Sequence, residues 1–337
     1  MKIKRVIISR TDSIGDVILT LPLAGILKKH FPDLHISFLG SNYTRDVINC
    51  AAYVDEFIDW NKINKLAENE AIELIKSKNA DAIIHVFPRK EIAILAKKAG
   101  IKYRIGTTNR LYHWFTCNKL TKLSRKKSDL HEAQLNIKLL KAFGINKTFS
   151  LKEISEYYGF KAKVLLPDNI NSLIDNHKIN LILHPKSKGS AREWGLDNFA
   201  TLIDILPSDK YKIFITGTEA EANLMKTEIL DKYNNIIDLT GKLSLAEFIT
   251  FISGCDALIA ASTGPLHIAA ALGKIAIGIY PPIKPMHPGR WMPIGKNAAY
   301  LVSEIYCEDC RKTNDCKCMR EISPEMVISK LEEIKNQ

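Results

Sequence analysis

Short apolar runs rich in Val and Ile alternate along this chain with longer segments whose apolar residues recur at helical spacing. A continuous apolar run between polar loops predicts a buried strand, and a spacing of three or four residues predicts an amphipathic helix. In the first half the predicted strands are 6–9, 35–39, 82–86 and 103–105. The predicted helices are 15–30, which Pro22 should kink, 65–78, 90–99, and 131–143, which Gly144 should end.

The second half repeats this alternation. Its predicted strands are 180–184, 212–216, 236–239, 257–261 and 275–280, and its predicted helices are 197–206, 219–232, 245–253, 265–272 and a last one opened by Ser323-Pro324. Strands that alternate with helices form parallel, doubly wound sheets. The weakly periodic segment 150–178 is the predicted junction. We therefore expect an α/β chain with two Rossmann-like domains, 1–165 and 166–337, and a cleft between them.

Composition and charge narrow the function classes. The chain has 337 residues, 46% of them hydrophobic and 25% charged, and no apolar run approaches the ~18 residues that a membrane span needs. No secretory signal is expected from the first residues, so the scattered cysteines Cys50, Cys117 and Cys255 are expected to be reduced in a cytoplasmic protein. Residues 1–165 carry a net charge of +13 and the remainder −2, within a total of +11. The first domain thus favours an acidic partner such as an anionic membrane surface or a phosphorylated substrate, although a solvated lysine-rich surface has the same composition. Nucleic acid is not expected, because no aromatic platform interleaves with the basic residues.

Two common nucleotide motifs are absent. No glycine is followed two residues later by another glycine, so the dinucleotide fingerprint is missing. None of the three Gly-Lys pairs has a glycine five residues before it, so no P-loop is present. The absence of both motifs argues against NAD-dependent redox chemistry and ordinary ATP hydrolysis.

Polar loops follow the predicted strands of the second half. Thr263 and Gly264 open a helix at a strand end, and His267 lies in its first turn, where backbone N–H groups attract a diphosphate. An ordinary helix cap would look the same. Another loop gathers cations and hydroxyls that suit a diphosphate, at positions Lys186, Ser187, Lys188, Ser190 and Arg192. Glu219 follows a third strand. Its carboxylate either accepts hydrogen bonds from ribose hydroxyls or stabilises the start of a helix through the helix dipole.

In the first half, the corresponding loop runs from Arg10 to Asp16. It carries two carboxylates, Asp12 and Asp16, to the start of the first helix. The helix dipole favours the ionised form of Asp16, and an ionised carboxylate suits a general base that takes a proton from a hydroxyl. Two capping aspartates would have the same spacing.

Four segments of the sequence resemble glycosyltransferase family 9, the ADP-heptose:lipopolysaccharide heptosyltransferases. They are RTDSIGDVILTLP, the HP-x-S-K loop with its following R-x-W, STGPLHIAAALG and GIYPPIKPMHPGRW, and the resemblance spans nearly the whole chain. It implies a GT-B fold with the nucleotide-sugar donor in the second domain and a lipid-linked oligosaccharide acceptor over the first. It also implies an inverting transfer of heptose from ADP-heptose that needs no metal or other cofactor, at the cytoplasmic face of the inner membrane.

The resemblance also implies residue roles. Asp16 falls on the catalytic aspartate, with Arg10, Thr11 and Ser13 on the acceptor side. The donor-binding positions are Ser187, Lys188 and Arg192 for the phosphates, Glu219 for the ribose, Leu243 beside the base, and Thr263, Gly264 and His267 for the diphosphate. Ser262 departs from the aspartate that many relatives have there, which leaves the transferred sugar open. A basic stretch in the first half either binds phosphates of the acceptor or forms a solvent-exposed loop. It consists of Lys119, Lys122, Arg125, Lys126 and Lys127.

Three readings remain beside the heptosyltransferase. The chain could transfer another nucleotide-linked sugar, act as an epimerase, or bind donor or lipid without catalysis. The cysteines Cys307, Cys310, Cys316 and Cys318 could form a zinc or iron site or two disulfides. Their tight spacing argues against a standard zinc knuckle, and we expect a local structural clip with no catalytic metal.

Overall fold

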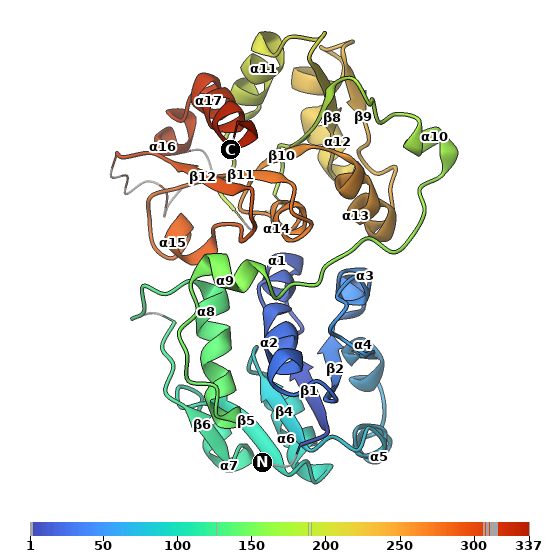
Figure 1. Ribbon diagram of the computed structural model, residues 1–337, viewed down its shortest axis with the longest axis vertical. Helices are drawn as coiled ribbons and strands as arrows, with labels where there is room; N and C mark the ends of the chain where they lie inside the picture. Colours follow the sequence, from blue (N-terminus) through green and yellow to red (C-terminus); the bar gives the residue numbers. More distant parts are fainter. Residues whose placement is uncertain are drawn as a thin grey trace. The chain divides into compact units, whose positions relative to one another are not determined.

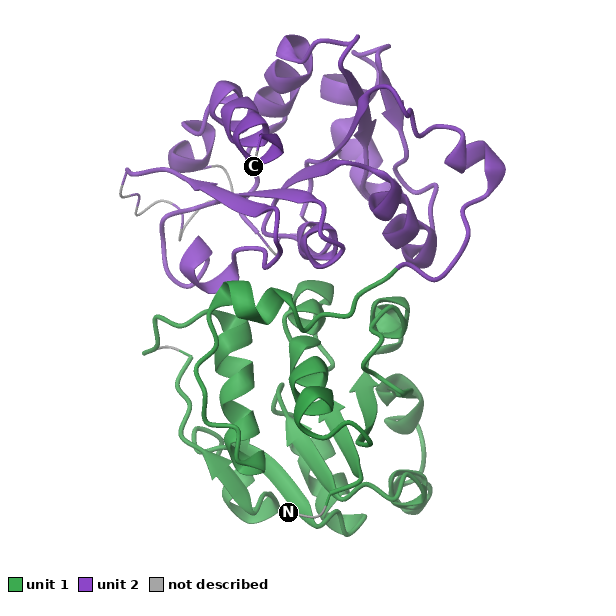
Figure 2. Ribbon diagram, viewed as in Figure 1, with its two compact units in different colours: residues 1–161 green, residues 162–337 purple. Residues whose placement is uncertain are grey.

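The computed structural model describes residues 3–125, 127–187, 189, 191–305, 307, 310 and 316–336. The predicted positions Lys126, Lys188 and Ser190 lie outside this part of the chain. The chain divides into two compact units, residues 1–161 and 162–337, so the division precedes the boundary predicted from the sequence (Figure 2). Each unit has its own sheet and its own apolar core.

Unit 1 is a six-stranded parallel sheet with helices around it (Figure 1). Its strands are β1 (Arg5–Ser9), β2 (His35–Gly40), β3 (Glu56–Asp59), β4 (Ala82–His85), β5 (Tyr103–Thr107) and β6 (Lys119–Thr121). Its helices are α1 (Ile14–Ile18), α2 (Pro22–His30), α3 (Arg45–Asn49), α4 (Trp60–Ile63), α5 (Glu68–Ser77), α6 (Lys90–Lys98), α7 (His113–Thr116), α8 (Glu132–Ile137) and α9 (Leu151–Ser155).

Unit 2 has the same construction. Its strands are β7 (Ile179–His184), β8 (Tyr211–Ile215), β9 (Ile236–Asp238), β10 (Ala257–Ala261), β11 (Ile275–Tyr280) and β12 (Ala298–Val302). Its helices are α10 (Asp168–Asn171), α11 (Leu196–Ile205), α12 (Glu219–Met225), α13 (Leu245–Gly254), α14 (Gly264–Ala271), α15 (Pro288–Trp291), α16 (Lys317–Arg320) and α17 (Pro324–Lys335).

The strand order determines where a ligand can bind. The first sheet runs β3-β2-β1-β4-β5-β6, and the second runs β12-β11-β10-β7-β8-β9, which is the same order counted from the other edge. In each sheet the winding reverses between the first and fourth strands, β1 and β4 in unit 1 and β7 and β10 in unit 2. Ligands of doubly wound sheets bind at this reversal, beyond the carboxyl ends of the strands. The loops after β1, β4, β7 and β10 are therefore the first places to look for a site.

The structure corrects the predicted helix over 15–30. Two helices, α1 and α2, replace it, and Pro22 stands at the first position of α2 instead of inside a kinked helix. Proline lacks a backbone N–H, and the first position of a helix needs none. The predicted helix over 131–143 is α8 followed by a tighter 3-10 turn over Lys138–Phe143, and Gly144 ends it in the left-handed conformation at φ +85° as predicted.

Candidate functional site

A buried arginine organises the loop after β1. The side chain of Arg10 is 3% exposed and its guanidinium is paired with three carboxylates. Its Nε donates to Asp12 Oδ1 at 2.7 Å, its Nη1 donates to Glu132 Oε1 at 3.1 Å, and its Nη2 donates to Asp16 Oδ1. The loop is therefore folded around one cation.

Glu132, in the first turn of α8, is a residue that the sequence reasoning missed. Its carboxylate is 1% exposed and also accepts two hydrogen bonds from Arg125 Nε, at 2.9 and 3.2 Å. Asn136, one turn further along α8, accepts from Arg125 at 3.1 Å and donates to the Leu19 carbonyl. This network ties the loop to α8. Arg125 is thus paired within unit 1, and its contact with acceptor phosphates remains a prediction.

Asp16 is held in place but remains accessible. One of its carboxylate oxygens accepts from Arg10 and the other accepts from the Ser13 hydroxyl, while its side chain is 19% exposed. It lies in the first turn of α1, where the backbone N–H groups favour a negative charge. A fixed, partly exposed carboxylate has the properties of a general base.

Burial and charge shift the protonation of its neighbours. Burial opposes the charge of Arg10, but Asp16, Asp12 and Glu132 outweigh it and raise the pKa of Arg10. Burial raises the pKa of Asp12, and Asp16 adds to this while Arg10 opposes it. Burial, followed by the two aspartates, raises the pKa of Tyr43 to about 12, and its hydroxyl donates to the Asp12 carbonyl at 2.6 Å. Tyr43 thus remains a neutral donor near the site.

Arg10 and Thr11, expected on the acceptor side, are buried, at 3% and 5% exposure. Their contacts hold the loop in shape, and their contact with an acceptor remains a prediction. Thr11 Oγ1 accepts from Arg89 Nε at 2.6 Å, which brings Arg89 from the loop after β4 to the reversal point of the sheet. The sequence reasoning missed Arg89. Ser13 is exposed and remains available to a ligand.

In unit 2, Thr263 and His267 lie at the start of α14, directly after β10. Thr263 caps the helix by position and is 5% exposed, and its Oγ1 has no hydrogen-bond partner among the described residues. His267 is 3% exposed in the first turn, and Gly264 opens the helix. An unsatisfied hydroxyl beside the N–H groups of a helix start suits an anionic ligand.

Hydrogen bonds and an ion pair within the loop after β7 hold it in shape. The Ser187 hydroxyl donates to the Ala191 carbonyl at 3.0 Å, and its backbone N–H donates to Glu193 Oε1 at 3.1 Å. Lys186 also pairs with Glu193. Ser187 thus fixes the shape of the loop, and its direct contact with a donor remains a prediction. Glu193 was not found from the sequence.

Arg192 extends from this loop and contacts a distant part of the chain. Its Nε donates to the backbone carbonyl of Cys310 at 2.8 Å. Because a guanidinium is planar, a hydrogen bond at Nε restricts the orientation of the whole group. The cation predicted to bind phosphates is therefore held by the segment that contains the clustered cysteines.

Glu219 is the first residue of α12, and the loop that carries Leu243 lies against it. Thr218 and Glu221 cap α12 reciprocally, which leaves the exposed Glu219 outside the capping hydrogen bonds. Gly241, at φ +69°, passes so close that a side chain there would touch Glu219, and its N–H donates to the Gly217 carbonyl at 2.9 Å. This contact places the segment that carries the half-buried Leu243 against the start of α12, as a shared ribose and base site requires.

The last residue of β7 is the buried histidine His184. His184 Nδ1 lies 3.0 Å from Thr216 Oγ1, at the end of β8, and its ring stacks at 6.3 Å on Phe248. Burial lowers the pKa of His184 to about 4, so the ring is neutral at physiological pH. It contributes shape and a hydrogen bond, not charge, beside the cationic loop.

Within the described residues, no helix is both long and apolar enough to cross a membrane.

Comparisons with known proteins identify the family of the chain. The sequence model of glycosyltransferase family 9 (heptosyltransferase) matches residues 70–319. A Haemophilus influenzae protein that is itself a predicted glycosyltransferase is 28% identical over 310 residues, covering 86% of each chain. The lipopolysaccharide core heptosyltransferase OpsX of the same organism is 21% identical over 325 residues, covering 92% of this chain and 86% of its own.

Solved structures show the same fold. A family 9 glycosyltransferase from Veillonella parvula matches with a TM-score of 0.79 at 21% identity, covering 98% of this chain and 97% of its own. The Escherichia coli ADP-heptose heptosyltransferase II matches with a TM-score of 0.76 at 18% identity, covering 98% of both chains. The two Rossmann-like units thus constitute the GT-B fold. With most of the sequence matched by the family model, the chain belongs to glycosyltransferase family 9, the heptosyltransferases.

Proposed function

We propose that this enzyme transfers heptose from ADP-heptose, with inversion, to a lipopolysaccharide core acceptor. The observation that carries the proposal is the set of loops at the reversal point of the second sheet. There an unsatisfied Thr263 hydroxyl, the start of α14 and the Arg192 loop offer donors to a diphosphate. The adjoining Glu219 and Leu243 suit the ribose and the base. Two relatives support the donor assignment, because one is named an ADP-heptose enzyme and another, WaaC, was solved with ADP.

The proposed reaction is a single displacement. Asp16 removes the proton from an acceptor hydroxyl while that oxygen attacks the anomeric carbon of the heptose. The bond between this carbon and the diphosphate oxygen breaks, its electron pair leaves with ADP, and the proton remains on Asp16. Attack on the face opposite the leaving group inverts the anomeric configuration. Arg192 and the N–H groups of α14 stabilise the negative charge of the departing diphosphate. Because these groups supply the positive charge, we propose that the chemistry needs no metal ion.

Nucleotide titration tests the donor assignment. We expect ADP to bind more tightly than UDP, GDP or CDP, in calorimetry with Mg²⁺-free buffer. Arg192→Ala should weaken ADP binding about tenfold to a hundredfold, because it removes charge-assisted hydrogen bonds worth ~1.5–3 kcal/mol. Lys210→Ala is the matched control, since Lys210 is an exposed cation of the same unit that pairs with Glu332. A preference for another nucleotide would contradict the donor, and binding without transfer to any acceptor would favour a non-catalytic protein.

Unit 1 has an exposed patch of large apolar side chains around α7. Leu111, Trp114 and Phe115 are 76%, 58% and 70% exposed, on α7 and just before it. Lys97 donates to the Phe115 carbonyl at 2.9 Å, and the exposed Arg110 precedes the patch. Exposed aromatic side chains beside cations are typical of surfaces that bind anionic bilayers. We propose that this patch contacts the cytoplasmic leaflet of the inner membrane.

Vesicle binding tests this surface. Trp114→Ser combined with Phe115→Ser should reduce sedimentation with phosphatidylglycerol-containing vesicles and leave ADP binding unchanged, because the patch lies in the other unit. Tyr300→Ser, at a 40% exposed position of unit 2, is the control and should bind vesicles normally. Equal vesicle binding by the double variant and the unchanged protein would contradict the assignment.

A further inference from the structure

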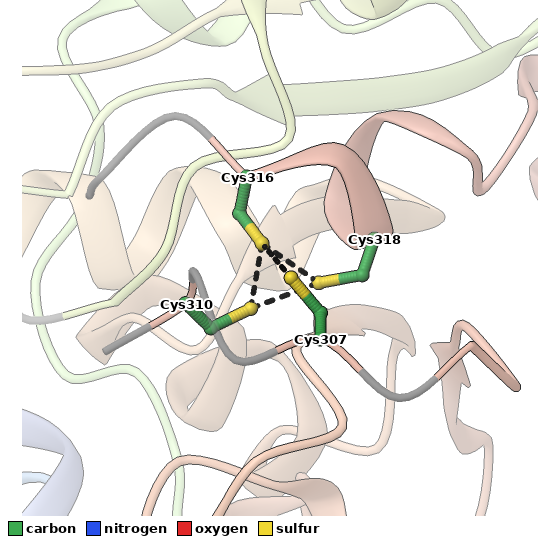
Figure 3. Close-up of side chains that lie close together, drawn as sticks. All are labelled: Cys307, Cys310, Cys316 and Cys318. Atoms are coloured by element: carbon green, nitrogen blue, oxygen red, sulfur yellow. Dashed lines mark hydrogen bonds between the residues drawn. The ribbon is translucent and has the colours of Figure 1, made fainter. Parts of the chain in front are cut away.

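The four clustered cysteines converge on one point. Cys307, Cys310 and the pair Cys316 and Cys318 at the start of α16 direct their sulfur atoms toward one another (Figure 3). All four Sγ atoms lie within 4.8 Å of one another, and Cys310, Cys316 and Cys318 are at most 1% exposed. We infer that these four thiolates bind one thiophilic metal ion, zinc or iron, and that this ion orients Arg192 through Cys310.

The spacing of the sulfur atoms fits one ion. Cys316 Sγ lies 3.1 Å from Cys307 Sγ, 2.6 Å from Cys310 Sγ and 3.0 Å from Cys318 Sγ. Cys310 Sγ lies 2.9 Å from Cys318 Sγ. Four sulfurs bound tetrahedrally at ~2.3 Å from Zn²⁺ lie ~3.8 Å apart, so these four pairs need to separate by only about 1 Å. Four cysteines around a single centre favour zinc or iron over harder ions.

Two disulfides describe the cluster less well. A disulfide pairs sulfurs two by two at ~2.05 Å, whereas Cys316 Sγ lies at similar distances from all three of its neighbours. None of the seven cysteines, all of which belong to the described part of the chain, forms a disulfide. A purely apolar packing of thiols does not require four sulfurs to point at one centre. The convergence is the feature that a shared ion explains.

The cluster is connected to the donor loop at several points. Arg192 donates to the Cys310 carbonyl, as described above. Trp194 Nε1, in the same loop, donates to the Ile322 carbonyl at 2.7 Å, just after α16. Arg320, at the end of α16, pairs with Asp197 at 2.7 Å. An ion bound by Cys310 and α16 would thus fix the carbonyl that restricts the Arg192 guanidinium. The cysteines are positioning residues in this scheme, and this second part rests on the proposed donor site.

The metal content of the full-length protein tests the first part. The protein is purified through a tag without histidines, and zinc and iron are measured by mass spectrometry. We expect about one ion per chain, and X-ray absorption should show four sulfur ligands at ~2.3 Å. Cys318→Ser should lose the ion, Cys307→His should retain it, because imidazole is also a zinc ligand, and Cys255→Ser should leave the content unchanged, because Cys255 is a buried cysteine of the same unit outside the cluster.

Two results would overturn the site. One is protein that contains neither metal after expression with added zinc or iron. The other is a count of three titratable thiols in denaturant with a chelator, where seven are expected, because four cysteines would then be in disulfides.

A double-mutant cycle tests the link to Arg192. Cys318→Ser should weaken ADP binding about tenfold, with kcat nearly unchanged, and Cys307→His should keep the affinity of the unchanged protein. Combined with Arg192→Ala, Cys318→Ser should add no further loss, because both act on the same cation. Additive losses, or full affinity in a folded metal-free variant, would refute the positioning role. Metal content does not depend on the donor, so absence of ADP binding in the unchanged protein would refute the proposed function alone.

Discussion

Asp16→Asn is expected to lower kcat about a hundredfold to ten-thousandfold and to leave ADP affinity unchanged. A general base contributes rate enhancement of this size, and asparagine cannot accept the proton of the acceptor hydroxyl. The amide oxygen of asparagine can still accept from Arg10, so the loop after β1 should keep its shape. The measurement is product formation under saturating donor, with ADP affinity measured separately by calorimetry.

Asp12→Asn is the matched control for this variant. Asp12 has nearly the same exposure as Asp16, 20% against 19%, and also pairs with Arg10. Its carboxylate faces the guanidinium and the loop, so we expect less than a tenfold change in kcat. If Asp16→Asn retained a kcat within threefold of the unchanged enzyme, Asp16 would not be the base.

Arg10→Met is expected to destabilise unit 1 by about 3–5 kcal/mol. Removing one partner of a buried ion pair leaves the other charge uncompensated, and Glu132 is 1% exposed. Asp12 and Asp16 would then repel each other beside it. Hydrogen exchange of the β1 and β4 amides measures the stability of this unit by itself.

Arg45→Met is the control for stability. Arg45 pairs with Asp59 at 3.0 Å, but its side chain is 40% exposed, and such pairs contribute about 1 kcal/mol or less. If Arg10→Met cost no more than Arg45→Met, the network around Arg10 would not stabilise the unit. If Arg10→Met removed activity without loss of stability, the role of Arg10 would be limited to positioning Asp16.

The central strands of both sheets could be predicted from the sequence, and two of the edge strands could not. β3 and β6 lie at sheet edges, and their short sequences EFID and KLT lack the continuous apolar run that marks a buried strand. β12, also at an edge, has that run in AAYLV and was overlooked. The predicted helix over 15–30 failed because Pro22 fits the first position of α2 as well as it fits a kink.

The site was predictable where its chemistry is local. Asp16, Thr263 and Glu219 lie at the starts of the helices that follow β1, β10 and β8, and the parallel direction of the strands brings these helix starts to one edge of each sheet. The partners that orient them are remote along the chain. Glu132 lies 122 residues from Arg10, Arg89 lies 78 residues from Thr11, and Cys310 lies 118 residues from Arg192. No local pattern encodes such contacts, because they depend on how the helices pack.

The candidate site residues of each unit are held by hydrogen bonds within that unit. The hydrogen bonds described for Asp16 all come from residues of unit 1, and those described for Arg192 and its loop come from residues of unit 2. Substitutions that reshape one half therefore need not disturb the other. Under the proposed function, the recognition of the acceptor could diversify in evolution while the donor-binding residues stayed constant. A chimaera that joins unit 2 of this chain to unit 1 of a relative should then inherit its acceptor preference from the relative alone.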